Sequence, residues 1–206
     1  MTDSQALRTM CLVVAIILFV LGLAAMGTAQ TETSPGTVMA ERPKLVPGDT
    51  WQWTYGIETF VGQDGDNLVF EYNITRKRYR TQDLNLVKTV SSDGSITQLR
   101  DPHSGHLNFP LSLGKIWSHS YASDGVLRQS HYKVAAYELV TVRAGTFMAY
   151  RIEGEDKRLD RRFGILRNTW YSPQAKQIVK MEDVDGSNNQ PVSGGTFELV
   201  RYSAAP

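Results

Sequence analysis

The chain has 206 residues, enough for one domain with a sizeable core, and its 22 basic and 21 acidic residues give a formal net charge of +1. This near-neutral balance argues against nucleic acid or an acidic membrane surface as the main partner. The single cysteine, Cys11, lies in an N-terminal apolar run. The rest of the chain therefore has no disulfide, thiolate nucleophile or cysteine metal site.

The first 29 residues predict export. Arg8 precedes an apolar run from Cys11 to Met26, and small residues at Gly27 and Ala29 follow it. A charged head, an apolar stretch and a small-x-small exit are typical of a secretory signal peptide, residues 1–29. An uncleaved membrane anchor is the alternative, although at about 1.5 Å per residue the run covers only ~24 Å of a ~30 Å hydrocarbon core. We therefore expect a periplasmic or extracellular protein.

Residues 30–42 are rich in Thr, Ser, Gly and Pro and predict a flexible lead-in to a β-sheet domain, residues 43–206. Beyond residue 42, short runs of β-branched and aromatic residues alternate with turn pairs, and no helical periodicity is sustained. The turn pairs are Asp64-Gly65, Asp93-Gly94, Asp124-Gly125 and Asp185-Gly186. This pattern predicts an all-β fold with one antiparallel, strongly curved sheet, either a half-barrel or an open barrel.

Two segments share the pattern G-x-x-W-x-x-x-Y. They are residues 48–55 and 114–121, with a further tyrosine, Tyr72 or Tyr132, in the strand after each following turn. Trp and Tyr are an even number of residues apart, so on a strand they share a face. One interpretation is an internal duplication that builds the sheet from two related halves; the other is two strands that each bury a tryptophan.

Three motifs follow one another in the second half of the chain. They are Phe109-Pro110-Leu111 with Gly114-Lys115-Ile116-Trp117, then Glu138-Leu139-Val140-Thr141-Val142-Arg143-Ala144-Gly145-Thr146-Phe147, then Trp170-Tyr171-Ser172-Pro173 with Val179-Lys180. In this order they resemble a widespread group of uncharacterised, secreted, β-rich bacterial proteins, which implies an exported β-sheet domain. The group has no agreed catalytic residues, so the resemblance assigns none to this chain. A more distant likeness is to half-barrel proteins that carry lipoproteins or other lipids across the bacterial envelope. Turns and strand ends also explain the motifs on structural grounds alone.

Candidate metal and catalytic residues are few. His103 and His106 have the spacing of a metal pair but no third ligand nearby. The oxygen-rich stretch 183–189 departs from the calcium-loop pattern and predicts a hairpin loop. No nucleophile elbow, phosphate-binding glycine loop or dinucleotide fingerprint occurs. We therefore expect a protein that is not an enzyme and that uses no metal and no cofactor.

Two further patterns concern strands. If Asp124 and Gly125 are the central residues of a hairpin turn, His119 pairs with Ser130, and His119 and His131 face opposite sides of the sheet. The basic clusters at 76–80 and 157–162 place alternate residues on one strand face, and acidic neighbours balance the second cluster. Contact with an anion or a phospholipid headgroup is the functional interpretation, and a charged edge that blocks sheet pairing is the structural one.

The candidate ligand-binding residues are the four tryptophans, Trp51, Trp53, Trp117 and Trp170. Such rings usually pack in a core, and the functional alternative is a concave pocket for a lipid or another hydrophobic ligand. The preferred hypothesis is an exported envelope protein that binds an apolar or amphipathic ligand in its curved sheet without catalysis. The alternatives are a structural domain with a filled core that binds an envelope protein partner, and a hydrolase. A continuous pocket next to Trp51, Trp117 or Trp170 would favour the first hypothesis.

Overall fold

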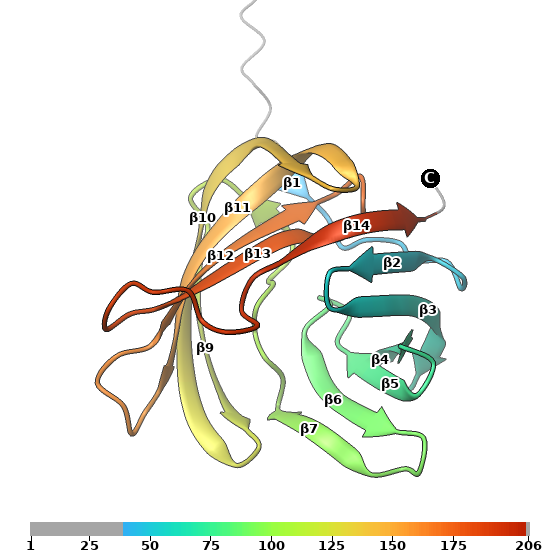
Figure 1. The fold of residues 1–206 in the computed structure, drawn as a ribbon, viewed down its shortest axis with the longest axis horizontal. Helices are drawn as coiled ribbons and strands as arrows, with labels where there is room; N and C mark the ends of the chain where they lie inside the picture. The colour runs from blue at the N-terminus through green and yellow to red at the C-terminus, as the bar shows by residue number, and fades with distance from the viewer. Residues whose placement is uncertain (1–38, 205–206) are drawn as a thin grey trace, which may run out of the picture. The chain divides into compact units, whose positions relative to one another are not determined.

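The computed structural model describes residues 39–204, and every regular element in this range is a β-strand (Figure 1). The predicted signal peptide, residues 1–29, and residues 30–38 of the predicted lead-in lie outside the described residues. The last part of that lead-in contributes β1 (Met39–Ala40), which pairs with β8 (Leu111–Ser112). Within residues 39–204 there is no helix that is long and apolar enough to cross a membrane.

Twelve antiparallel strands form one closed barrel, in the order β10-β11-β12-β13-β14-β2-β3-β4-β5-β6-β7-β9. Their bounds are β2 (Thr50–Trp53), β3 (Gly56–Asp64), β4 (Asn67–Tyr72), β5 (Arg76–Arg80), β6 (Leu86–Ser91), β7 (Ile96–Asp101), β9 (Ile116–Ser123), β10 (Val126–Val142), β11 (Gly145–Arg158), β12 (Ile165–Ser172), β13 (Gln177–Asp185) and β14 (Phe197–Ser203). The predicted all-β fold with a strongly curved antiparallel sheet is confirmed. The sheet closes on itself instead of remaining open.

The barrel closes through two short stretches of strand pairing, whereas other neighbouring strands pair over most of their length. β10 and β11 pair over fourteen residues each side, with one bulge at Val134/Ala136. By contrast, β13 pairs with β14 only at Lys180 and Met181, and β7 pairs with β9 only at Arg100 and Asp101. The barrel thus consists of two broad curved sheets joined along two narrow seams.

The hairpin at Asp124-Gly125 has the predicted register. Ser123 pairs with Val126 and His119 pairs with Ser130, while His131 pairs with Ser118. Both central turn residues have positive φ, 51° for Asp124 and 82° for Gly125, which is the conformation that a two-residue hairpin requires. Asp64-Gly65 and Asp93-Gly94 also lie in hairpins, between β3 and β4 and between β6 and β7, whereas Asp185-Gly186 opens the longer loop between β13 and β14.

The two G-x-x-W-x-x-x-Y segments differ in the fold. In the second, Trp117 and Tyr121 are buried on the same face of β9. In the first, β2 ends at Trp53 and the chain turns into β3 at Gly56, so the expectation that Trp51 and Tyr55 share a strand face is wrong. The reason is the turn at residues 54–55, which places Tyr55 beyond the end of its strand.

The connection from β7 to β9 crosses the inside of the ring of strands in Figure 1. Its Leu107, Phe109 and Leu111 are buried in the main apolar core. Asn85, in the β5–β6 turn, holds it in place: its amide donates to the Leu107 carbonyl at 2.7 Å and its carbonyl accepts from the Leu107 N–H at 2.8 Å. This segment fills part of the interior with the protein's own side chains. The space that remains is a cavity lined by residues of both broad sheets.

Candidate ligand-binding cavity

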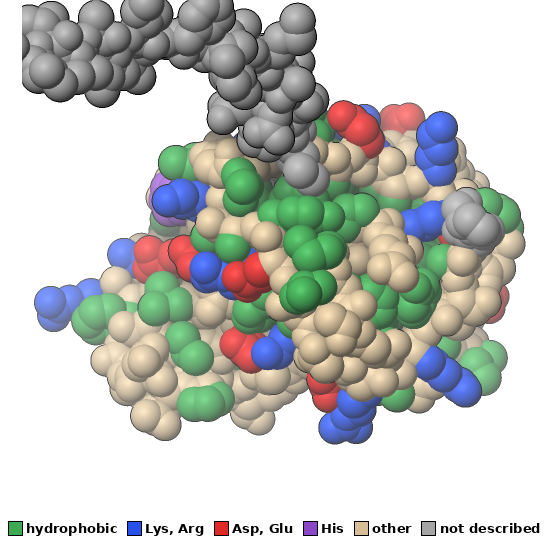
Figure 2. Space-filling model, turned by 90° about the horizontal axis from the view of Figure 1, so that it is seen from above, with side chains coloured by type: hydrophobic (Ala, Val, Ile, Leu, Met, Phe, Trp, Pro, Cys, Tyr) green, Lys and Arg blue, Asp and Glu red, His purple; other side chains and the backbone are tan. Residues whose placement is uncertain are grey.

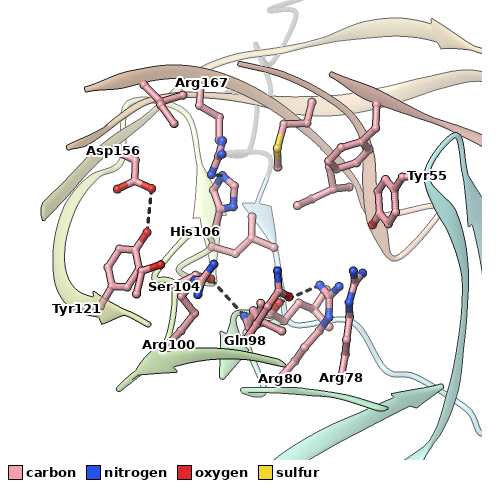
Figure 3. A pocket seen from close by; sticks show the side chains of 18 of the residues that line it. Tyr55, Arg78, Arg80, Gln98, Arg100, Ser104, His106, Tyr121, Asp156 and Arg167 are labelled. Carbon is pink, nitrogen blue, oxygen red and sulfur yellow. Dashed lines mark hydrogen bonds between the residues drawn. The ribbon is translucent and has the colours of Figure 1, made fainter. Parts of the chain in front are cut away.

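A cavity of about 490 Å³ lies inside the barrel, and its lining comes from both broad sheets (Figure 3). One part of the wall is apolar, with side chains from β2, β12, β13 and β14: Trp53, Ile165, Ile178, Met181 and Phe197. The other part carries five arginines, Arg78, Arg80, Arg100, Arg128 and Arg167, with Gln98, His106, Tyr121 and Asp156. The lining is therefore amphipathic and rich in cationic groups.

Arg78 and Arg80 reach the cavity because they alternate along β5 and so share its inner face. Both bind the same carboxylate, that of Glu58 on β3. Arg78 donates from Nη1 to Oε1, and Arg80 donates from Nη2 to both oxygens at 2.9 and 3.0 Å. The Glu58 side chain is fully buried, with a relative exposure of 0%. Arg78 also lies over the Tyr72 ring, 3.6 Å from its centroid.

Asp156 on β11 has two partners on neighbouring strands. The Arg128 Nε donates to one carboxylate oxygen at 2.9 Å, and the Tyr121 hydroxyl donates to the other at 2.8 Å. Burial and the adjacent Asp156 charge raise the pKa of Tyr121, so its hydroxyl stays protonated and acts as a donor. This carboxylate is therefore neutralised by Arg128 and held by Tyr121.

Arg167 on β12 forms a forked pair with Asp183 on β13, through its Nε at 2.6 Å and through its Nη2. Burial alone would lower the pKa of Arg167, but hydrogen bonds and charge from Asp183 outweigh it and raise the pKa. The remaining amino group, Nη1, donates to His106 Nε2 at 3.4 Å. Burial, together with the charges of Arg167 and Arg80, holds the pKa of His106 well below its usual range. The imidazole is thus a neutral acceptor at Nε2.

The fifth arginine, Arg100, binds Asp124 in the half-exposed β9–β10 hairpin turn, at 2.8 Å. Arg128 and Arg167 each have a carboxylate of their own, whereas Arg78 and Arg80 share one. Five arginines of the lining therefore face four carboxylates, those of Glu58, Asp124, Asp156 and Asp183. The surplus positive charge lies at Arg78 and Arg80. On the surface shown in Figure 2, by contrast, basic and acidic side chains are interspersed.

The four tryptophans are not gathered around this cavity. Trp53 lines it, and its indole N–H donates to the Ile178 carbonyl at 2.8 Å. Trp51 is buried in the core and donates to the Ala175 carbonyl, and Trp117 donates to the Gly105 carbonyl. Trp170 donates to Glu138 at 2.9 Å and lies under Lys180. A role in ligand contact thus has a structural basis for Trp53, while ligand binding by all four stays a prediction.

The histidines occupy three separate environments. His103 and His119 stack with centroids 4.3 Å apart, and the His119 Nε2 lies 2.8 Å from the His103 carbonyl oxygen. His106 lies next to Arg167, as Figure 3 shows. His131 contacts the Ser118 hydroxyl at 2.8 Å among exposed atoms. Within residues 39–204 no group of three or more His, Cys, Asp or Glu side chains has a metal-binding arrangement.

The sequence alone indicated two of the five arginines that line the cavity. The cluster at 76–80 pointed to Arg78 and Arg80, and its alternation predicted that they share a face. Arg100, Arg128 and Arg167 were missed, because none of them lies in a basic cluster and only the barrel brings them together. The sequence signal for them was weak, since each is a single arginine that follows a leucine.

No protein-family model matches the chain, and no curated protein matches it. Among solved structures, it is similar to the hypothetical lipoprotein YmcC from Escherichia coli, with 10% identity and a TM-score of 0.48 over 79% of this chain and 90% of that one. It is also similar to a lipoprotein from Parabacteroides distasonis, with 12% identity and a TM-score of 0.41 over 81% of this chain and 100% of that one. Both likenesses are weak, and the resemblance inferred from the three sequence motifs stays a prediction.

Proposed function

We propose that this chain is an exported, non-catalytic binding protein that holds an amphipathic ligand inside its barrel. The observation that carries this proposal is the cavity of about 490 Å³. Its volume falls within the roughly 300–1,000 Å³ typical of small-molecule sites. A domain that served only as a scaffold would gain stability by filling such a space with its own side chains.

The composition of the wall supports an amphipathic ligand over a purely apolar one. Ile165, Ile178, Met181 and Phe197, with Trp53, offer an apolar surface for a hydrocarbon or aromatic part. The arginine side of the lining offers charged hydrogen-bond donors for a polar part. An entirely apolar ligand would leave these donors desolvated without new partners, which is unfavourable.

The contacts inside the cavity support binding over hydrolysis. Ser104 is the acceptor of a bond from the Leu86 N–H at 3.2 Å, and His106 accepts from Arg167. Neither forms a serine–histidine pair with the other in the described residues. The one hydrogen bond between a serine and a histidine side chain in residues 39–204 joins Ser118 and His131, among exposed atoms and away from the cavity lining. A nucleophile there would have no enclosed site for its substrate.

The test is native mass spectrometry of the full-length chain, exported by its natural host and purified gently. We expect a small-molecule adduct on the wild-type protein. Ile165→Trp, which places an indole in the cavity wall, should remove the adduct. The matched control is Leu166→Trp on the same strand, where the side chain is 41% exposed and does not line the cavity. A bare wild-type mass from a host that makes the ligand would contradict the proposal and favour a partner-binding domain.

A further inference from the structure

We infer that the cavity binds the acidic end of its ligand, a carboxylate or a phosphate group, at Arg78 and Arg80, an inference that rests on the proposed function and names the chemistry of the ligand.

The surplus charge is local. Arg128 with Asp156 and Arg167 with Asp183 are one-to-one pairs. Arg78 and Arg80 share Glu58, so two guanidinium groups face one carboxylate. Their side chains are only 15% and 13% exposed, so water shields the unbalanced charge poorly. A second anion beside Glu58 would give the two arginines two negative partners instead of one.

The two arginines differ in how far their donors are used. Arg80 donates from Nη2 to both Glu58 oxygens and from Nη1 to the Leu84 carbonyl at 3.2 Å. Arg78 donates to Glu58 from Nη1 alone. Its Nη2 donates to no carboxylate or carbonyl among residues 39–204, and the Tyr55 hydroxyl is a further hydrogen-bonding neighbour of the guanidinium group. Arg78 is therefore the arginine with an amino group that has no carboxylate or carbonyl partner.

The shape of the guanidinium group favours particular anions. Arginine presents planar, forked donors that match the oxygens of a carboxylate or phosphate. Figure 3 shows the Arg78 and Arg80 side chains next to each other, both directed into the cavity, with Gln98 beside Arg80. Adjacent forks can be bridged by one oxyanion. A cationic headgroup would instead meet the surplus positive charge.

The apolar wall suggests that the anion is carried on an apolar body. Trp53 and Phe197, in edge-to-face contact with centroids 6.5 Å apart, line the same cavity as Arg78. An acidic lipid or fatty acid has both parts. A free inorganic anion would use only the arginine side, so probes with and without a tail distinguish the two sources.

The experiment is isothermal titration of the full-length chain with decanoate, decyl phosphate, decanol, decyltrimethylammonium and inorganic phosphate. We expect the two tailed anions to bind at least about tenfold more tightly than decanol, which corresponds to about 1.4 kcal/mol, and the cation to bind no better than decanol. Rising salt should narrow this difference because it screens the charge.

The variant is Arg78→Gln, which removes the surplus charge and leaves Glu58 paired with Arg80. It should lose most of the preference for decanoate over decanol and keep its affinity for decanol. The matched control is Arg76→Gln, the same change at an exposed position of the same strand, outside the cavity lining. Circular dichroism and thermal unfolding establish that both variants are folded.

The outcomes separate the two proposals. Equal binding of decanoate and decanol by the wild-type protein would overturn the anion site and leave the proposed function standing. Inorganic phosphate that binds as tightly as decyl phosphate would support the anion site and contradict an amphipathic ligand. If Arg78→Gln keeps the full preference for decanoate, or if no probe binds, the assignment to Arg78 and Arg80 is wrong.

Discussion

Replacing Glu58 by glutamine is expected to be among the most destabilising single polar changes in this barrel. The carboxylate is fully buried and accepts hydrogen bonds from both Arg78 and Arg80. The change to glutamine is nearly isosteric, so packing is preserved and the effect is electrostatic. Two mostly buried guanidinium groups, 15% and 13% exposed, would be left facing a neutral amide.

The magnitude follows from the two-to-one arrangement. Removing one partner of a buried ion pair typically costs about 3–5 kcal/mol, because the other charge stays buried without compensation. Arg78→Gln should cost only about 1 kcal/mol, since Glu58 keeps Arg80 and what is lost is one bond and the contact with Tyr72. In the Glu58→Gln background, adding Arg78→Gln should raise stability, because it removes one of two uncompensated charges.

Urea unfolding of the full-length chain, followed by tryptophan fluorescence, measures these differences at a fixed, low salt concentration. The decisive comparison is the sign of the Arg78→Gln effect in two backgrounds: destabilising in the wild-type protein and stabilising in the Glu58→Gln variant. If Glu58→Gln costs no more than Arg78→Gln, or if the double variant is less stable than Glu58→Gln alone, Arg78 and Arg80 carry no surplus charge.

Three further predictions concern other parts of the fold. Burial, and then the charges of Arg167 and Arg80, lower the pKa of His106 in the folded protein, so the unfolded chain takes up a proton first as the pH falls. Between about pH 7 and about pH 5.5 the wild type should therefore lose about 1 kcal/mol more stability than His106→Gln. An equal pH dependence of the two proteins would contradict this. A Cβ at Gly154 would lie 2.2 Å from Cδ1 of the Tyr132 ring, so Gly154→Ala should lower the free energy of unfolding in urea by about 1–3 kcal/mol. The control, Glu153→Ala at the neighbouring exposed position, should change it little. An unchanged stability of Gly154→Ala would show that the ring moves freely. In hydrogen exchange, the paired amides at the β13–β14 and β7–β9 seams should exchange faster than those between β10 and β11, and uniform protection would exclude weak seams.

Local features of the fold followed from the sequence because they depend on neighbouring residues. The Asp124-Gly125 turn predicted the pairing of His119 with Ser130, since a two-residue hairpin leaves one register. Alternation at 76–80 placed Arg78 and Arg80 on one face. Aromatic and β-branched runs separated by turns predicted an all-β curved sheet, and these signals need no tertiary information.

Barrel closure and the composition of the cavity wall depend on distant residues. β14 joins the sheet at Leu199 opposite Trp53, and no local pattern reports that pairing. The partners of Arg128 and Arg167 lie on adjacent strands, at Asp156 and Asp183, where only the register reveals them. Aromatic content suggested ligand contacts at four tryptophans. The number of aromatic residues, however, does not indicate which of them face the cavity and which pack in the core. Trp53 alone among them lines the cavity.

The place of β14 between β13 and β2 has a consequence for the order of assembly. Thr50 pairs with Ser203, so strands from opposite ends of the described chain must meet before the ring is complete. During synthesis from the N-terminus, β2 has an unpaired edge until the last strand emerges. Contacts of such large sequence separation form slowly. A chaperone that holds the nascent chain until β14 is available would therefore protect this protein from pairing edge to edge with its own copies.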